Sequence, residues 1–216
     1  MKDKPNEWVS ISDLMSGVMA VVMLLLVVSV VQKTYAEIQH KQEMMQGENA
    51  KRAKVSQLLN ELKTDLNAQG VNDLIDFNIG DFRLTLKDGA FEKGSACITP
   101  LARQALENVE SKIVEHLRSA SQNSVFVDGH TDSDPVKMPV TNYEKYCTVY
   151  DDNYTLSAAR AREARKLLIS QLNDKEAKRI IVAGYGDSQP LAGMLETDPR
   201  NRRVEIRFSI EHSEKN

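Results

Sequence analysis

The 216-residue sequence lacks an excess of one charge, has few aromatic residues and contains only two cysteines. Its 28 basic and 31 acidic residues give a net charge of −3 without a basic stripe, which argues against a nucleic-acid-binding protein. The cysteines, Cys97 and Cys147, form no CxxC pair and the four histidines are scattered, so the spacing of a zinc site is absent. Internal repeats and low-complexity tracts are also lacking. The length leaves room for a membrane segment and one further domain.

Motifs of enzyme active sites are missing as well. His130 lies close to Asp132, but no Gly-x-Ser-x-Gly or metal-binding motif accompanies them. The pair Gly184 and Gly186 lacks the third glycine and the opening helix of a dinucleotide-binding loop. We therefore expect a protein that is not an enzyme and that holds no cofactor or metal.

One long apolar run is present near the N-terminus. Residues 14–31 read LMSGVMAVVMLLLVVSVV and carry no charge. Eighteen helical residues rise about 27 Å, close to the hydrocarbon thickness of a bilayer. A cleaved signal peptide fits poorly, because the run is long, acidic residues precede it and no A-x-A site follows. The sequence predicts a retained transmembrane helix over 8–32, preceded by a short tail, 1–7.

Asp13 stands where this run begins, and its position allows two interpretations. A carboxylate at the start of a helix is a common N-cap and suits the helix dipole. A titratable carboxylate inside a membrane is costly and usually marks an ion path. Position alone favours the cap.

The string around Asp13 bears on this choice. Residues 8–19, Trp-Val-Ser-Ile-Ser-Asp-Leu-Met-Ser-Gly-Val-Met, resemble the N-terminus of MotB-like stator B subunits. The resemblance implies that Asp13 is the ion-carrying carboxylate of a channel for H⁺ or Na⁺, and its Asp-Leu-Met-Ser core is closer to sodium-driven members. The span lacks the phenylalanines common in flagellar stators.

The segment 33–70 is polar and is predicted to be a helical linker. Val55, Leu59, Leu62 and Leu66 recur at intervals of four, three and four, which makes one heptad seam. We expect a solvated helix with a short dimeric coiled coil near its C-terminal end. The alternative is an amphipathic helix that lies on the following domain.

The remainder, 71–212, alternates strands and helices before a tail, 213–216. Apolar periodicity and caps predict strands over 77–86, 124–127, 179–183 and 203–210, and helices from Thr99-Pro100 to Leu117 and over 156–172. This order predicts an α/β (α+β) domain with helices on one face of a mixed sheet.

Five motifs in order place this domain in a family. They are Phe91-Glu-Lys-Gly-Ser-Ala…Thr-Pro, Gly129-His-Thr-Asp, Asn153-Tyr-Thr-Leu-Ser-Ala-Ala-Arg-Ala, Gly184-Tyr-Gly and Asn201-Arg-Arg-Val-Glu-Ile. Their order and spacing resemble the OmpA-like peptidoglycan-binding domain, whose ligand is the peptide stem, usually its diaminopimelate.

The resemblance also implies a set of ligand-binding residues. An aspartate holds the ammonium of the ligand and an arginine clamps its carboxylate, which is a pairing suited to a zwitterion. The resemblance assigns these roles to Asp132 and Arg160, and Thr131, Asn153, Leu156 and Arg203 match positions that frame the pocket.

The stretch 133–152 is longer than is usual in that family and holds Cys147. We expect it to shield or reshape the pocket. Cys97 precedes the first predicted helix, so a Cys97–Cys147 disulfide would pin the insertion in an oxidising compartment. Two reduced thiols are the alternative.

Together these resemblances imply a B-type stator subunit of an ion-driven rotary motor in the bacterial inner membrane. The expected partners are a multi-span A-type subunit that forms a ring around a B dimer, a second copy of this chain, and peptidoglycan. Since peptidoglycan lies outside the inner membrane, the N-terminus is expected in the cytoplasm and the domain in the periplasm. The span and the insertion suggest the B subunit of the Zorya anti-phage system. The alternatives are a flagellar-type stator and a passive tether between membrane and wall.

Overall fold

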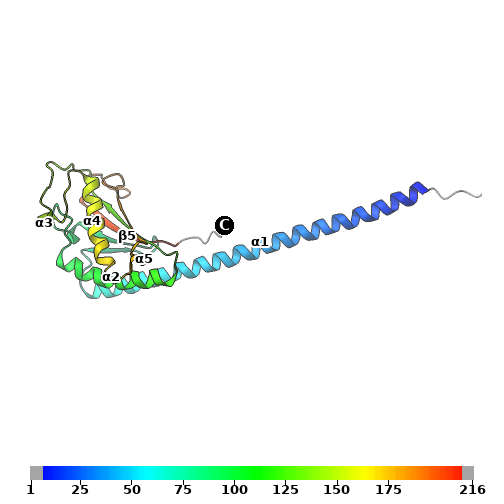
Figure 1. The fold of residues 1–216 in the computed structure, drawn as a ribbon, viewed down its shortest axis with the longest axis horizontal. Coiled ribbons are helices and arrows are strands. Elements are labelled where there is room, and N and C mark those ends of the chain that lie inside the picture. Colours follow the sequence, from blue (N-terminus) through cyan, green and yellow to red (C-terminus); the bar gives the residue numbers. More distant parts are fainter. Residues whose placement is uncertain (1–6, 211–216) are drawn as a thin grey trace, which may run out of the picture. The chain divides into compact units, whose positions relative to one another are not determined.

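The computed structural model describes residues 7–210 and divides the chain into two units after Asn49. Most of the expected N-terminal tail, the end of the expected domain at 211–212, and the tail 213–216 lie outside the described residues. Figure 1 shows the elements along the chain.

Helix α1 (Glu7–Ala68) makes up the described part of the first unit and continues into the second. It contains an 18-residue window of mean hydropathy 2.8, so it is long and apolar enough to cross a membrane. No helix break separates the expected span from the expected linker. Because α1 begins at Glu7, Asp13 lies in its second turn and is not the N-cap, which removes the capping interpretation.

The second unit is built on a five-stranded sheet. The strands are β1 (Ile75–Asn78), β2 (Arg83–Lys87), β3 (Val125–His130), β4 (Ile180–Gly184) and β5 (Arg203–Phe208), in the order β1-β2-β5-β3-β4. Only β3 and β4 pair in parallel, so the sheet is mixed, as expected. The further elements are α2 (Pro100–Ser119), α3 (Tyr143–Tyr146), α4 (Asn153–Leu168), α5 (Asp174–Ala177) and the short 3₁₀ helices η1 (Asp88–Ala90) and η2 (Pro199–Asn201).

The expected single strand over 77–86 is wrong: the chain forms a hairpin there. β1 and β2 pair antiparallel around a tight turn. The Asn78 side chain accepts a hydrogen bond from the backbone N–H of Asp81, and Phe82 adopts a positive φ of 51°. These local contacts reverse the chain between two short apolar stretches that a pattern of alternation joins into one.

The helix termini follow their capping residues. Thr99 caps α2 with Pro100 in the first turn, as predicted. Asp152 caps α4, which therefore begins at Asn153, earlier than the expected start at residue 156, and ends at Leu168 instead of 172. The earlier start brings Asn153 and Leu156 into the first turn of α4.

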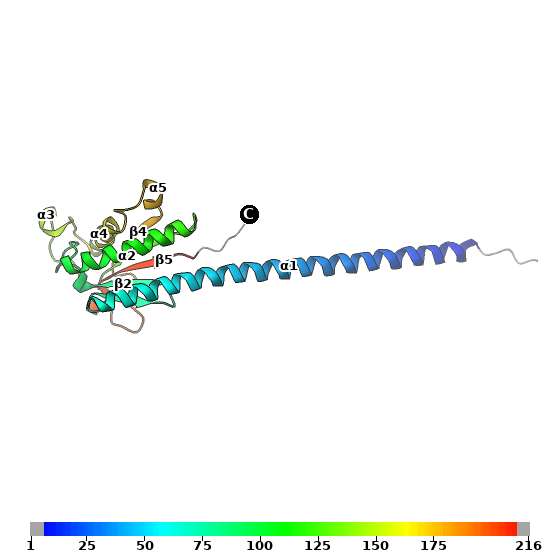
Figure 2. The same ribbon diagram turned by 90° about the horizontal axis from the view of Figure 1, so that it is seen from below.

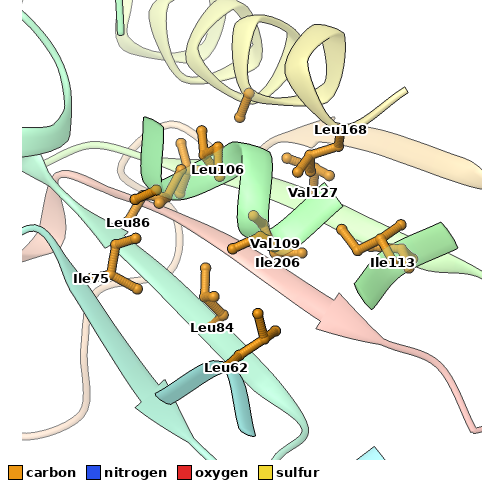
Figure 3. Packing of buried hydrophobic residues seen from close by; sticks show 14 of the residues in the cluster. Leu62, Ile75, Leu84, Leu86, Leu106, Val109, Ile113, Val127, Leu168 and Ile206 are labelled. Atoms are coloured by element: carbon orange, nitrogen blue, oxygen red, sulfur yellow. The ribbon is translucent and has the colours of Figure 1, made fainter. Parts of the chain in front are cut away.

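One face of the sheet carries the core. Figure 3 shows Leu84, Val127 and Ile206 from the strands gathered with Val109 of α2 and Leu62 of α1, and all of them are buried. Figure 2 gives a second view of α2 and α4 beside the strands. Their apolar side chains belong to this same cluster, so the helices cover one face as predicted.

The heptad seam of α1 is part of this core. Val55, Leu59, Leu62 and Leu66 are at most 4% exposed within the single chain. They are therefore not available to a coiled coil, and the alternative interpretation, an amphipathic helix lying on the domain, is the correct one for this segment. The upstream apolar residues Ile38 and Met45 remain exposed.

Two glycines bring α4 against the sheet. A Cβ on Gly129 would lie 2.0 Å from the carbonyl oxygen of Ser157, and one on Gly184 would lie 2.6 Å from the Cβ of Ala158. Both approaches require glycine. They place the end of β3, with its following residues, beside the first two turns of α4.

Candidate functional site

The residues after β3 are fixed by backbone contacts. Thr131 donates its N–H to the carbonyl of Gly186 at 2.8 Å, and the Asn153 side chain donates to the carbonyls of Asp132 and Asp134 at 3.1 and 3.0 Å. The motifs after β3, at the start of α4 and after β4 are thereby brought together, as the resemblance predicts. Asn153 acts on the backbone of Asp132, so its role here is to position that carboxylate.

Arg160 of α4 is the largest fully buried side chain of the domain. Its Nε donates to the carbonyl of Ser95 at 2.9 Å, and one Nη donates to the carboxylate of Asp88 at 3.1 Å. Its guanidinium also lies 5.0 Å from the centre of the Phe91 ring. Burial lowers the pKa of the Arg160 guanidinium, and Asp88 opposes that shift. A buried guanidinium of this kind requires an anionic partner.

Asp132 and Arg160 do not pair with each other in the structure; each binds a different partner. Arg202 binds the Asp132 carboxylate through one Nη and the Asp88 carboxylate through Nε, the latter at 3.1 Å. The four side chains thus form a charge chain, which we define as Arg160–Asp88–Arg202–Asp132. Cations and anions alternate along it, so that each is neutralised in the absence of a ligand.

Asp88 and Arg202 are the two members that sequence reasoning missed. Asp88 lies three residues before Phe91, the first residue of its motif, and Arg202 is the first arginine of the Asn201-Arg-Arg motif. Arg203, which was expected to frame the pocket, donates instead to Glu205 at 2.7 Å and to the carbonyl of Asn201 at 3.1 Å. Arg203 is the first residue of β5, so its side chain lies on the same face of the strand as that of Glu205, two residues along, whereas Arg202 precedes the strand.

Thr131 and Leu156, the other expected pocket residues, are both buried at this site. The hydroxyl of Thr131 is buried and has no hydrogen-bond partner among the described residues. A buried hydroxyl without a partner is costly and suggests a place for a ligand group or a water.

His130 is not suited to proton transfer here. Burial lowers the pKa of its imidazole to about 4, and its ring stacks on Tyr185 at 5.3 Å between centroids. The imidazole is therefore neutral near pH 7.

The insertion, residues 133–152, contacts the loop before α2, and the carbonyl of Ser95 in that loop binds Arg160. Cys97 and Cys147 form a disulfide with a Cα–Cα distance of 5.1 Å, which confirms the predicted pairing. The carbonyl of Tyr146 accepts hydrogen bonds from Ser95 Oγ and from the N–H of Ala96, at 3.0 and 3.1 Å. Tyr150 donates its hydroxyl to the carbonyl of Gly94 at 2.6 Å. Ser95 is also the residue whose carbonyl binds Arg160, so the insertion supports the arginine through this loop.

The site combines a buried guanidinium with a nearby carboxylate. Such a pair can bind a group that carries both a carboxylate and an ammonium, provided that the ligand replaces Asp88 at Arg160 and Arg202 at Asp132. No cluster of metal-binding side chains occurs among residues 11–210, whose side chains the structure describes.

Comparison with known proteins agrees with this geometry. The model of the OmpA family matches residues 90–203, more than half of the chain. The chain is 26% identical to "Zorya protein ZorB" of Escherichia coli, over 97% of this chain and 89% of that protein.

Two solved structures are also similar. One is the cell wall anchor of the T6SS from Pseudomonas aeruginosa, at 28% identity and a TM-score of 0.50, covering 69% of this chain and 94% of that one. The other is a putative MotB like protein from Desulfovibrio vulgaris, at 21% identity and a TM-score of 0.57, covering 74% of this chain and 97% of that one, which shows the shared fold. The recognition made from the motifs is confirmed: this chain belongs to the OmpA family.

Proposed function

We propose that this chain is the peptidoglycan-anchored B-type stator subunit of an ion-driven rotary motor in the bacterial inner membrane, and that the motor acts in anti-phage defence. One combination carries the proposal: a single chain joins an OmpA-family domain to a helix whose apolar segment, between Glu7 and Lys33, contains one carboxylate, Asp13. No other charged residue occurs between Glu7 and Lys33. An isolated carboxylate in such a helix is costly unless it serves ion transfer.

The defence role is supported by the relative of nearly equal length. The similarity to the Zorya protein extends over both the apolar helix and the domain, since it covers 97% of this chain. The T6SS cell wall anchor supports wall binding by the domain alone. The genes next to this one test the assignment directly: a gene for a multi-span A-type subunit among defence genes supports it, and flagellar genes would favour a flagellar-type stator.

In this proposal the domain holds the cell wall through a zwitterionic group of the peptide stem. Asp132 binds the ammonium and Arg160 the carboxylate, with Thr131, Asn153 and Leu156 around them. The N-terminus then lies in the cytoplasm and the domain in the periplasm, where the Cys97–Cys147 disulfide persists. A dimer of this chain, surrounded by A-type subunits, would carry H⁺ or Na⁺ on Asp13.

Wall binding is tested by sedimentation of the full chain, solubilised in detergent, with purified peptidoglycan sacculi. Asp132→Asn and Arg160→Lys keep size or charge but remove the ionic or bidentate contact. Each change should weaken binding by on the order of 1.5–3 kcal/mol, the value of a charged hydrogen bond. Lys166→Ala, on the exposed side of α4, is the matched control and should bind normally. Unchanged binding by both site variants would refute the assigned pocket.

Ion transfer is tested by Asp13→Asn in cells that also carry the neighbouring A-type gene. Asparagine keeps the size of the side chain but remains neutral, so it cannot load and release an ion. We expect phage protection to be lost while membrane insertion and sacculus binding persist. Full protection by this variant would leave a passive tether as the function.

A further inference from the structure

A hollow of about 520 Å³ lies over the polar side of strands β1, β2 and β5. Polar side chains of the strands form its floor, and the segment between β4 and β5 contributes Leu191 and Met194 to its lining. The volume falls within the range of roughly 300–1,000 Å³ that is typical of small-ligand sites. The hollow is large enough for more than a single amino-acid group.

The hollow adjoins the charge chain. Asp88 and Arg202 belong to both, since they line the hollow and bind Arg160 and Asp132. The side chains of Asp88 and Arg202 are 37% and 31% exposed, whereas those of Arg160 and Asp132 are 2% and 6% exposed. The members of the chain that meet solvent are therefore the two that line the hollow. A ligand that displaces them approaches Arg160 and Asp132 from this side.

The charges of the hollow are mostly paired within the protein. Arg83 and Arg203 bind Glu205, while Arg200 binds Asp198. Lys87 differs: its ammonium donates to the carbonyl of Asn72 at 3.0 Å and forms no ion pair with any carboxylate in the described part of the chain.

Asp76 also lines the hollow, and its carboxylate accepts a hydrogen bond from the N–H of Phe77 without a cationic partner among residues 7–210. The hollow therefore offers one unpaired cation and one unpaired anion. Lys87 and Asp88 both line the hollow, so the cation of Lys87 faces the same space as the exposed side of the charge chain.

We propose that this hollow binds the acidic peptide arm to which the zwitterionic group is attached, with Lys87 pairing with a free carboxylate of that peptide. This inference rests on the proposed binding of the peptide stem and adds a second subsite to it. The zwitterion occupies Arg160 and Asp132, and the adjoining residues of the peptide lie along the hollow. Asp76, which lies opposite Thr85 on the neighbouring strand, disfavours a carboxylate beside it. Wall recognition then depends on the charge state of the peptide as well as on its terminal group.

The test measures the affinity of the detergent-solubilised full chain for three probes. They are diaminopimelate alone, a stem tripeptide that contains it and has free carboxylates, and the same tripeptide in which the carboxylates outside the zwitterionic group are amidated. Lys87→Gln should weaken binding of the acidic tripeptide by on the order of fivefold, as expected for one partly exposed ion pair. The same variant should bind diaminopimelate and the amidated tripeptide as the unchanged protein does. Lys175→Gln on α5, which removes an equal charge outside the hollow, should alter none of the affinities.

The outcomes separate this subsite from the proposed wall binding. An unaltered affinity of Lys87→Gln for the acidic tripeptide overturns the subsite, and so does an equal loss for all three probes. Wall binding itself fails only if the unchanged protein binds none of the probes or if Asp132→Asn binds all of them normally.

Discussion

Removal of the disulfide tests whether the insertion supports the ligand site. In the double variant Cys97→Ser with Cys147→Ser, the loop that holds Ser95 keeps only its hydrogen bonds to the insertion, two to the Tyr146 carbonyl and one from Tyr150. The side chain of Arg160 depends on this loop, because the Ser95 carbonyl accepts from its Nε. We expect both stability and wall binding to fall.

The size of the stability effect follows from the length of the closed loop. The two cysteines are 50 residues apart. For such a loop the chain-entropy model gives about 4 kcal/mol, and measured values are typically about 2–4 kcal/mol. The loss of binding should be smaller: a looser Arg160–Ser95 contact removes part of a charged hydrogen bond, which corresponds to roughly tenfold in affinity.

The measurements are urea unfolding of the full chain in detergent and sedimentation with sacculi at a temperature where the variant is folded. Tyr150→Phe keeps the disulfide but removes the hydrogen bond to Gly94, so its affinity for sacculi should lie between those of the unchanged protein and the double cysteine variant. Tyr143→Phe, at an exposed side chain of α3, is the matched control. A folded double variant that binds sacculi normally would refute the supporting role of the insertion, whatever its stability.

Three further changes test the fold around the site. Gly129→Ala places a Cβ 2.0 Å from the carbonyl oxygen of Ser157. The free energy of unfolding should therefore fall by more than about 3 kcal/mol, and wall binding should be lost. Normal stability of this variant would contradict the close approach of α4 to the sheet. Leu62→Ala removes a buried side chain and should destabilise the domain by about 2–5 kcal/mol. The control Ile38→Ala changes an exposed side chain and should leave the unfolding of the domain unchanged. Equal effects of the two changes would mean that the seam of α1 is not part of the core. Burial lowers the pKa values of His116 and His130 to about 4, whereas an unfolded chain takes up these protons nearer pH 6.5, so stability should fall as the pH drops through that interval. His116→Asn should make this dependence shallower and leave the part due to His130. An unaltered slope would exclude His116 as a source.

Local features of the site were predictable because they depend on residues close in sequence. The apolar run after Asp13 predicts a membrane helix from composition alone, and Thr99 and Pro100 predict the start of α2 through contacts within one helical turn. The ordered motifs identified Asp132 and Arg160 as candidates, and the structure places both in one charge chain.

The partners of these residues were not predictable in the same way. Asp88 and Arg160 are 72 positions apart, and Asp132 and Arg202 are 70 apart. Their pairing depends on the order of the strands, which puts β5 between β2 and β3 and so brings Arg202 between Asp88 and Asp132. No local pattern carries that information.

The sequence by itself therefore determined the apolar helix and the caps, since these follow from composition and from short-range contacts, and its ordered motifs identified the domain through their resemblance to a known family. The tertiary structure decided that the seam of α1 packs on its own domain, because an apolar stripe at helical spacing fits a coiled coil and a domain core equally well. It also decided that Arg202 binds Asp132 while Arg203 binds Glu205, because β5 begins between the two arginines and aligns only Arg203 with Glu205 on one face of the strand.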